Sequence, residues 1–249
     1  MEVAVLGLGE AGSLIAADLV AAGCTVRAWD PARRPQGVPN AESDLEAVRG
    51  AELVLSLTTA AHALAAAASV APVLSRAAVY ADLNTAAPQL KRELASIVPA
   101  PFADVALIGV VPGSGLRVPA LASGSGAERF AELLRPLGMP VDVVGAQAGD
   151  AAGVKLLRSV FMKGLAAASI EAVEAAKLAG AEARIRSEIA GVIGEPLLDR
   201  LLSGSRIHAA RRVGEMQAAA AYLSELGIEP RVATAAAEWL TELRDEPGS

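Results

Sequence analysis

The sequence has very little of several residue types on which whole classes of protein depend. A single cysteine among 249 residues excludes a disulfide within the chain and a cysteine-rich metal site. Two histidines leave hardly enough ligands for a histidine-based zinc site. Aromatic residues make up only 3% of the chain, too few for a surface on which nucleic-acid bases stack. We therefore expect no metal site and no nucleic-acid partner.

The sequence also lacks an excess of positive charge and any long hydrophobic run. The formal net charge is −6, which argues against binding to a phosphate backbone. Although the mean hydropathy is +0.42, charged residues interrupt the apolar runs well before the roughly 20 residues that a membrane span needs. The first residues, MEVAVLG, carry no basic segment of the kind that begins a signal peptide. We expect a soluble cytoplasmic protein without a membrane partner.

What the first half of the sequence does have is a regular alternation of short apolar runs with alanine-rich and leucine-rich segments. The apolar runs have the length of buried strands, and the segments between them have the composition of helices. The expected strands are residues 3–7, 25–29, 53–57, 79–83, 105–109 and 141–144, and the first helix is 11–22. Such alternation is typical of a parallel, doubly wound sheet covered by helices on both faces.

The second half has a different pattern, with no convincing strand. A long helix is expected over residues 151–179, because its apolar residues recur at helical spacing. Shorter helices are expected at 183–192, 197–202, 206–226 and 232–243. The chain is therefore predicted to be an α/β protein of two domains, with an open sheet in residues 1–148 and an all-helical domain in residues 149–249.

A glycine-rich turn separates the first expected strand from the first helix. It has the pattern GxGxxG and consists of Gly7, Leu8, Gly9, Glu10, Ala11 and Gly12. In dinucleotide-binding folds the first glycine permits the tight turn, the second admits the pyrophosphate, and the third lets helix and strand pack closely. Asp30 ends the second expected strand, where an acidic residue accepts hydrogen bonds from the ribose hydroxyls. The N-terminal domain is therefore predicted to be a Rossmann domain that binds NAD or NADP.

The residues near Asp30 bear on the choice between these two cofactors. A carboxylate repels the 2′-phosphate of NADP, so Asp30 favours NAD. Arg33 and Arg34 follow closely and could pair with that phosphate, or they could be solvated charges of a loop. NAD is slightly favoured.

Two further segments accompany the glycine turn, DLNTAAP at 82–88 and GDAAGVK at 149–155. Together the three resemble the β-hydroxyacid dehydrogenases, which include 6-phosphogluconate and 3-hydroxyisobutyrate dehydrogenases. The resemblance covers nearly the whole chain, and the C-terminal half is similar to a poorly characterised bacterial branch labelled phosphogluconate-dehydrogenase-like. It implies a Rossmann domain followed by a helical substrate and dimerisation domain. The implied activity is NAD(P)-dependent hydride transfer between nicotinamide and a small hydroxy acid.

The resemblance also implies roles for residues of the long helix. Lys155 matches the family's general acid and base, which removes a proton from an alcohol as hydride leaves. The alternative is a lysine whose ammonium lies in water. Ser159 follows one turn later, where the family usually has an asparagine that contacts the substrate. Lys163 continues the same face and either meets an anionic group of the substrate or is solvated.

Further substrate and cofactor residues are implied at the ends of the expected strands. The resemblance puts Asn84 and Thr85 near nicotinamide and substrate, and a helix N-cap ahead of Pro88 is the alternative. It relates the loop of Leu57, Thr58 and Thr59 to the cofactor. The family's Ser-Gly-Gly substrate loop reads here Ile108, Gly109 and Val110. Arg212, on a helical stripe with His208 and Glu215, either pairs with the substrate or forms surface ion pairs.

Departures from the family pattern keep other functions open. The altered substrate loop and Ser159 favour a different small acid or a less polar one. They also leave an imine or aldehyde reductase, or a dinucleotide-binding protein without catalysis, as alternatives. The partners we expect are a small anionic substrate and a second copy of the chain, because the long helix should expose an apolar stripe in the helical domain.

Overall fold

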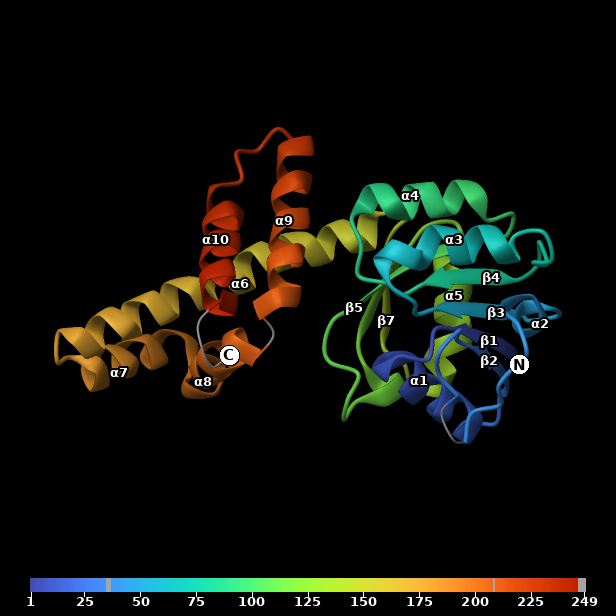
Figure 1. The fold of residues 1–249 in the computed structure, drawn as a ribbon, viewed down its shortest axis with the longest axis horizontal. Helices are drawn as coiled ribbons and strands as arrows, with labels where there is room; N and C mark the ends of the chain where they lie inside the picture. The colour runs from blue at the N-terminus through green and yellow to red at the C-terminus, as the bar shows by residue number, and fades with distance from the viewer. Residues whose placement is uncertain (35–36, 208, 246–249) are drawn as a thin grey trace. The chain divides into compact units, whose positions relative to one another are not determined.

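The computed structural model describes residues 1–34, 37–207 and 209–245 (Figure 1). The chain divides into two compact units, the first spanning Met1–Lys155 and the second beginning at Leu156. The first unit contains all the described strands and the second consists of helices. The predicted fold class, a doubly wound α/β domain followed by an all-helical region, is confirmed.

The first unit is built on one sheet of seven strands, in the order β2-β1-β3-β4-β5-β6-β7. The strands are β1 (Glu2–Leu6), β2 (Thr25–Trp29), β3 (Leu53–Ser56), β4 (Val79–Asp82), β5 (Phe102–Leu107), β6 (Ala120–Ser123) and β7 (Val141–Gly145). The first five are mutually parallel, whereas β6 runs antiparallel to β5 and β7 runs parallel to β6. The prediction of a fully parallel sheet is therefore wrong for the last two strands.

The reversal at β6 follows a connection that contains no α-helix. Residues 108–119 contain two prolines and three glycines and form only a short 3-10 turn, η1 (Gly115–Arg117). A crossover between parallel strands usually includes an α-helix; this connection has none, and β6 runs antiparallel to β5. Strand β6 itself, with the sequence ALAS, has no β-branched residue and was not predicted. Because β5 ends at Leu107, the expected strand at 105–109 extends too far.

Helices cover both faces of the sheet. On one face pack α1 (Glu10–Ala21) and α5 (Ala127–Leu134), which the 3-10 turn η2 (Arg135–Leu137) follows. On the other pack α2 (Asp44–Val48), α3 (Ala60–Val70) and α4 (Pro88–Ile97) (Figure 1). Successive residues of β1 point to opposite faces of the sheet. Val5 belongs to the apolar cluster that contains residues of α1, whereas Ala4 and Leu6 belong to the cluster that contains residues of α3. A strand buried on both faces explains the near-continuous apolar runs of the sequence.

The order of the strands creates a crevice at one edge of the sheet. Strands β2 and β3 lie on opposite sides of β1, so the direction in which the chain winds changes at β1. In open α/β sheets, ligands bind at such a switch point, outside the carboxyl ends of the strands. The residues that follow β1 and β3 are Gly7 and Leu57, two of the predicted cofactor residues.

The second unit is helical. The long helix α6 (Asp150–Leu178) begins in the first unit and continues into the second. It is followed by α7 (Glu182–Ile193), α8 (Glu195–Ile207), α9 (Ala209–Glu225) and α10 (Arg231–Asp245). Helices α9 and α10 lie side by side and bury an apolar cluster that includes Met216 and Leu240, with Leu156 contributed by α6 (Figure 1). Within the described ranges, no helix combines the length and hydropathy needed to cross a membrane.

Candidate functional site

The three glycines of the turn after β1 differ in what their missing side chains permit. Gly7 has a φ of +94°, and a Cβ there would lie 2.5 Å from the carbonyl oxygen of Leu57. A Cβ on Gly12 would lie 2.0 Å from the carbonyl oxygen of Gly7. A Cβ on Gly9 would meet only the Arg33 guanidinium, at an ordinary 3.6 Å. The protein's own packing therefore requires Gly7 and Gly12, whereas it would admit a methyl group at position 9.

Asp30 ties the end of β2 to this glycine turn. Its Oδ2 accepts a hydrogen bond from the N–H of Leu8 at 2.8 Å, and its Oδ1 accepts from the N–H groups of Ala32 at 2.9 Å and Arg33 at 3.0 Å. Partial burial alone would raise the pKa of Asp30, but these three hydrogen bonds and the charge of Arg33 outweigh it and lower the pKa. Asp30 is therefore a fixed anion beside the turn and a suitable acceptor for ribose hydroxyls.

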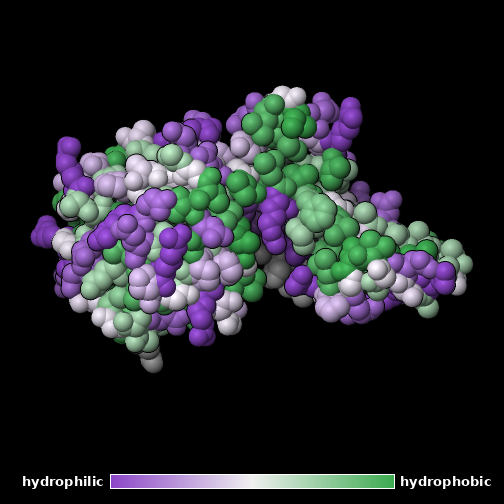
Figure 2. Space-filling model, turned by 180° about the vertical axis from the view of Figure 1, so that it is seen from behind, coloured by the Kyte–Doolittle hydropathy of each residue, from purple (hydrophilic) through white to green (hydrophobic). Residues whose placement is uncertain are grey.

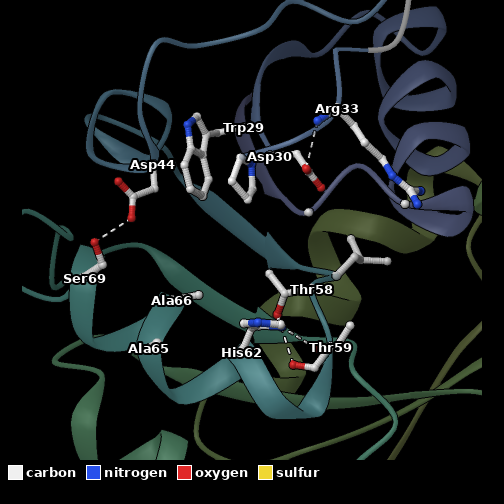
Figure 3. Close-up of a pocket in the computed structure, with 14 residues that line it drawn as sticks. Trp29, Asp30, Arg33, Asp44, Thr58, Thr59, His62, Ala65, Ala66 and Ser69 are labelled. Carbon is white, nitrogen blue, oxygen red and sulfur yellow. Dashed lines mark hydrogen bonds between the residues drawn. The ribbon is translucent and has the colours of Figure 1, made fainter.

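A cavity of about 450 Å³ opens beside the glycine turn (Figure 3). It lies between the end of β2, the loop after β3 and one face of α3, and its volume is typical of small-molecule sites. The predicted cofactor residues that line it are Gly7, Gly9, Asp30, Arg33, Leu57, Thr58 and Thr59. The remaining four, Leu8, Glu10, Ala11 and Gly12, lie in the turn and the start of α1 without lining the cavity.

Sequence reasoning missed the other residues that line this cavity. They are Trp29, Pro31, Asp44, His62, Ala65, Ala66 and Ser69. Four of them lie on one face of α3 at the spacing of helical neighbours, a signal that the sequence already contained. The ring nitrogen Nδ1 of His62 lies 2.8 Å from Thr59 Oγ1, and the hydroxyl of Ser69 donates to Asp44 (Figure 3). These pairs give the cavity polar groups beyond those of the glycine turn.

The two arginines after Asp30 have different environments. The guanidinium of Arg34 donates to the carbonyl oxygens of Asp30 and Arg33 and so braces the loop. The guanidinium of Arg33 lies beside Gly9 and lines the cavity (Figure 3). The cavity therefore holds a carboxylate suited to ribose hydroxyls and a guanidinium suited to phosphate oxygens.

Two predicted substrate-site residues, Lys155 and Thr85, are in direct contact. Lys155 lies in the second turn of α6, half-buried, and its Nζ donates to Thr85 Oγ1 at 3.0 Å. Thr85 follows β4 in the loop that leads to α4. The hydrogen bond places the ammonium group at the carboxyl edge of the sheet.

Asn84, the neighbour of Thr85, is only 7% exposed and has a fixed amide. Its Nδ2 lies 2.6 Å from Asp82 Oδ2 and 3.3 Å from the hydroxyl oxygens of Ser56 and Thr58. A carboxylate only accepts hydrogen bonds, so the amide nitrogen must face Asp82 and the amide oxygen must face away from it. The N-cap alternative is wrong, because Ala87 occupies the N-cap of α4 and no side chain caps that helix.

The altered substrate loop, which begins at Ile108, follows β5, the strand next to β4. Gly109 and Val110 lie in the connection from β5 to β6, and Val110 is 62% exposed. A Cβ on Gly109 would lie 3.4 Å from the side chain of Val118. Val110 thus presents an apolar side chain to solvent.

The other predicted substrate residues belong to the second unit. Ser159 is buried, and its hydroxyl accepts a hydrogen bond from Lys163 Nζ at 3.0 Å. Lys163 also forms an ion pair of 2.8 Å with Glu215, and its side chain is only 16% exposed. The interpretation of Lys163 as a solvated charge is therefore wrong. Arg212 is half-buried on α9, while His208 lies outside the described residues.

Two known domain families match the chain. Residues 2–117 match the NAD binding domain of 6-phosphogluconate dehydrogenase. Residues 172–243 match a domain of unknown function, DUF1932. The first match contains the glycine turn, Asp30 and the lined cavity.

Solved structures resemble the chain over nearly its whole length. A conserved hypothetical protein from Sinorhizobium meliloti 1021 is 32% identical with a TM-score of 0.82, and the alignment covers 100% of this chain and 92% of that one. The conserved protein MTH1747, of unknown function, is described as structurally similar to 3-hydroxyacid dehydrogenases. It is 29% identical with a TM-score of 0.83, and the alignment covers 98% of this chain and 97% of that one. The 3-hydroxyisobutyrate dehydrogenase of Mycobacterium tuberculosis has the same fold. It is 22% identical with a TM-score of 0.83, and the alignment covers 96% of this chain and 92% of that one.

A curated relative is also similar. It is an uncharacterized 28.5 kDa protein of Methanothermus fervidus, encoded in a 7S RNA 5′ region, and is 28% identical over 173 residues. The match covers 68% of this chain and 66% of the relative, just under two thirds of its length. The matched domains and the full-length structural relatives agree with the strand order and the glycine turn, and the chain belongs to the β-hydroxyacid dehydrogenase family, with a nicotinamide-dinucleotide-binding domain at its N-terminus.

Proposed function

We propose that the protein is an NAD(P)-dependent oxidoreductase that interconverts a small hydroxy acid and its oxo acid, with Lys155 as general acid and base. The observation that carries the proposal is the hydrogen bond of 3.0 Å between Lys155 Nζ and Thr85 Oγ1. It holds a proton-transferring group at the same sheet edge as the glycine turn, where family members bind their cofactor. The family membership supplies the reaction class.

In this proposal the residues of the chain have separate tasks. The bound nicotinamide supplies the acceptor or donor of hydride. Lys155 takes the hydroxyl proton at Nζ when the alcohol is oxidised and returns it when the carbonyl is reduced. Thr85 orients the amine through its hydroxyl, and Asn84 presents its amide oxygen as a hydrogen-bond acceptor.

The substrate is proposed to be a small acid with a less polar body than the usual family substrates. Val110 carries an exposed apolar side chain in the loop where the family has glycine. Gly109, in the same loop, lies close to the side chain of Val118. In the helical unit, Ser159 lies four residues after Lys155 on the same face of α6, and it and Arg212 are proposed to help select the substrate. Lys163 is the weaker candidate, because Glu215 balances its charge.

The cofactor is proposed to be NAD rather than NADP. The lowered pKa of Asp30 keeps a negative charge beside the glycine turn, which repels a 2′-phosphate. Arg33 favours the opposite choice, and its guanidinium is more exposed than the carboxylate, so solvent screens it more strongly. NADH should therefore bind more tightly than NADPH, and Asp30→Asn should reduce that preference.

Turnover tests this proposal. The purified chain is incubated with NAD or NADP and a panel of small β-hydroxy acids, and formation of reduced nicotinamide is followed by absorbance. A second panel contains imines and aldehydes with NADH or NADPH. Oxidation of a hydroxy acid supports the proposal, and reduction of imines or aldehydes alone would replace it by the reductase alternative. Tight cofactor binding without turnover on either panel would indicate a dinucleotide-binding protein that lacks catalysis.

Alanine substitutions at Gly9 and Gly12 should separate cofactor binding from folding. Gly9→Ala should leave thermal stability nearly unchanged, since only the flexible end of Arg33 is near, but should weaken NADH binding about tenfold or more by obstructing the pyrophosphate. Gly12→Ala should instead destabilise the protein, because its Cβ would overlap the Gly7 carbonyl. Thermal unfolding and NADH fluorescence titration measure the two effects. Equal NADH affinity for Gly9→Ala and the native protein would contradict binding at this turn.

The protein is further proposed to be a homodimer formed through its helical unit. Helix α7 has no buried residue, and large apolar side chains of this unit are exposed, among them Phe161 (67%), Leu178 (94%) and Val192 (85%). Figure 2 shows apolar surface gathered over the helices of this unit. Short helices are rarely stable in water without packing, so a second copy is the expected cover.

Light scattering at micromolar concentration should therefore give about twice the chain mass of 25.2 kDa. Leu178→Glu should shift the population toward the single chain, whereas Leu45→Glu, at a leucine of the first unit that is 38% exposed, should not. A mass of one chain for the native protein would refute the dimer.

A further inference from the structure

A buried charged group lies behind the loop that carries Asn84 and Thr85. Lys91 of α4 is 1% exposed, and its Nζ lies 2.6 Å from Asp82 Oδ1, 2.8 Å from the Asp82 carbonyl oxygen and 3.2 Å from Asp104 Oδ1. Asp82 ends β4 and Asp104 lies in β5, and both are fully buried. We call these three residues the buried triad. The ammonium group thus donates two hydrogen bonds to Asp82 and forms an ion pair with Asp104.

One arm of the buried triad reaches Asn84. The second carboxylate oxygen of Asp82 accepts from Asn84 Nδ2 at 2.6 Å. Because Lys91 holds the first oxygen, the orientation of the Asp82 carboxylate is fixed and so is that of the amide. The atom that Asn84 can offer to a ligand is consequently its oxygen.

The other arm reaches the start of α6. Asp104 Oδ2 accepts from the N–H groups of Gly149 at 3.1 Å and Ala152 at 2.9 Å, and from the Ser123 hydroxyl at 3.2 Å. Ser123 Oγ in turn accepts from the N–H of Ala151 at 2.9 Å. These bonds cap the N-terminus of the helix that carries Lys155 one turn later.

Charge and close packing explain why this arrangement is stable. The buried triad holds two carboxylates and one ammonium group, and the positive end of the α6 dipole offsets the excess negative charge. Gly149 has a φ of +103°, and a Cβ there would lie 2.9 Å from the Pro88 carbonyl oxygen, so the starts of α4 and α6 are in close contact. The first-turn amides of Ala151 and Ala152 are bonded within the protein, which argues against an anion site there.

We propose that the buried triad is a positioning unit for the reaction, which fixes the amide of Asn84 and the first turn of α6 and thereby holds Lys155 against Thr85. The inference rests on the proposed function, since it assumes that Lys155 transfers the proton. Apolar residues of similar volume could stabilise the fold equally well, but they could neither orient an amide nor cap a helix. The polar contacts of the buried triad do both, through Asp82 Oδ2 to the amide of Asn84 and through Asp104 Oδ2 to the first turn of α6.

Asp104→Asn tests the positioning role, because it keeps the shape of the side chain and weakens both the Lys91 pair and the helix cap. We expect kcat to fall about tenfold to hundredfold, the range for a small misplacement of a catalytic group. The affinity for NADH should stay within about a factor of two, because the glycine turn and Asp30 are distant from the change. Asp142→Asn, at an exposed aspartate of β7, is the matched control and should change neither value.

A second measurement does not depend on turnover. The rate at which an amine-selective acylating reagent modifies Lys155 is measured by mass spectrometry, with the exposed Lys177 as internal reference. Thr85→Val gives the rate expected when the hydrogen bond to Lys155 is lost. Asp104→Asn should raise the Lys155 rate several-fold toward that value, and a purely structural role would leave it unchanged in the folded protein.

A milder variant covers the case in which Asp104→Asn does not fold. Ser123→Ala removes one hydroxyl from the same cap and should give a smaller change in the same direction in both measurements. Native kcat and native Lys155 reactivity in the folded variants would overturn the inference. Failure of the proposed function can be told apart from failure of this inference. If Lys155 does not transfer the proton, Lys155→Met retains turnover, but the acylation rate of Lys155 in the other variants still reports on its positioning.

Discussion

Replacing Lys155 by methionine should lower kcat by a factor of about 10² to 10⁴, the usual contribution of general acid–base catalysis. Methionine preserves much of the aliphatic stem but has no group that can accept or return the hydroxyl proton. The hydrogen bond to Thr85 would also be lost. NADH binding should be nearly unchanged, because Lys155 is not among the residues that line the cavity beside the glycine turn.

Two further variants make this result specific. Lys177→Met changes an exposed lysine of the same helix, paired with Glu174, and should retain native turnover. Lys155→Arg keeps the positive charge but cannot release a proton near neutral pH, so it should be almost as slow as Lys155→Met. Steady-state kinetics with the substrate found in the panel measure all three. Full turnover by Lys155→Met would remove the assigned proton transfer.

The parts of the molecule that the sequence predicted best are those determined by neighbouring residues. The glycine turn is such a part, because the pattern, the flanking strand and the following helix are all local, and Asp30 lies at the end of the next strand. The edge of the sheet was predicted less well. Whether β6 runs parallel or antiparallel depends on how the chain packs after the Pro112–Pro119 loop, and the four residues of β6 give only a weak signal of their own.

The buried triad shows where prediction from sequence fails for a physical reason. A lysine in a helix is normally exposed, so Lys91 was not recognised as a buried residue. Its spacing was informative, since Pro88, Lys91 and Leu94 form one buried stripe of α4. The partners of Lys91 come from two different strands, and their distances follow only from the packing of α4 on the sheet. For the same reason the face of α3 that lines the cavity was missed, although its spacing was visible.

Replacing Lys91 by methionine should lower the free energy of unfolding of the first unit by about 3–5 kcal/mol, because removal of one partner leaves buried carboxylates without their counterion. For a protein of this length, that loss corresponds to a fall in Tm of roughly 6–20 °C. Lys177→Met should change the free energy of unfolding by less than about 0.5 kcal/mol, since its ion pair is exposed. Lys91→Met/Asp104→Asn should be less destabilised than the sum of the single changes, because the double variant leaves one buried carboxylate fewer.

The pH dependence of this loss has a definite sign. Burial alone would lower the pKa of Lys91, but Asp82 and Asp104 outweigh it and raise the pKa above its ordinary value. The stabilisation is therefore complete below the unfolded-state value of about 10.4 and disappears as the pH rises through the higher folded-state pKa. Urea unfolding followed by Trp29 fluorescence, in a Trp239→Phe background, reports on the first unit, since the chain has two tryptophans. The difference between native protein and Lys91→Met should be constant from neutral to mildly alkaline pH and shrink beyond, and equal stability of the two at neutral pH would exclude a buried ion pair at this position.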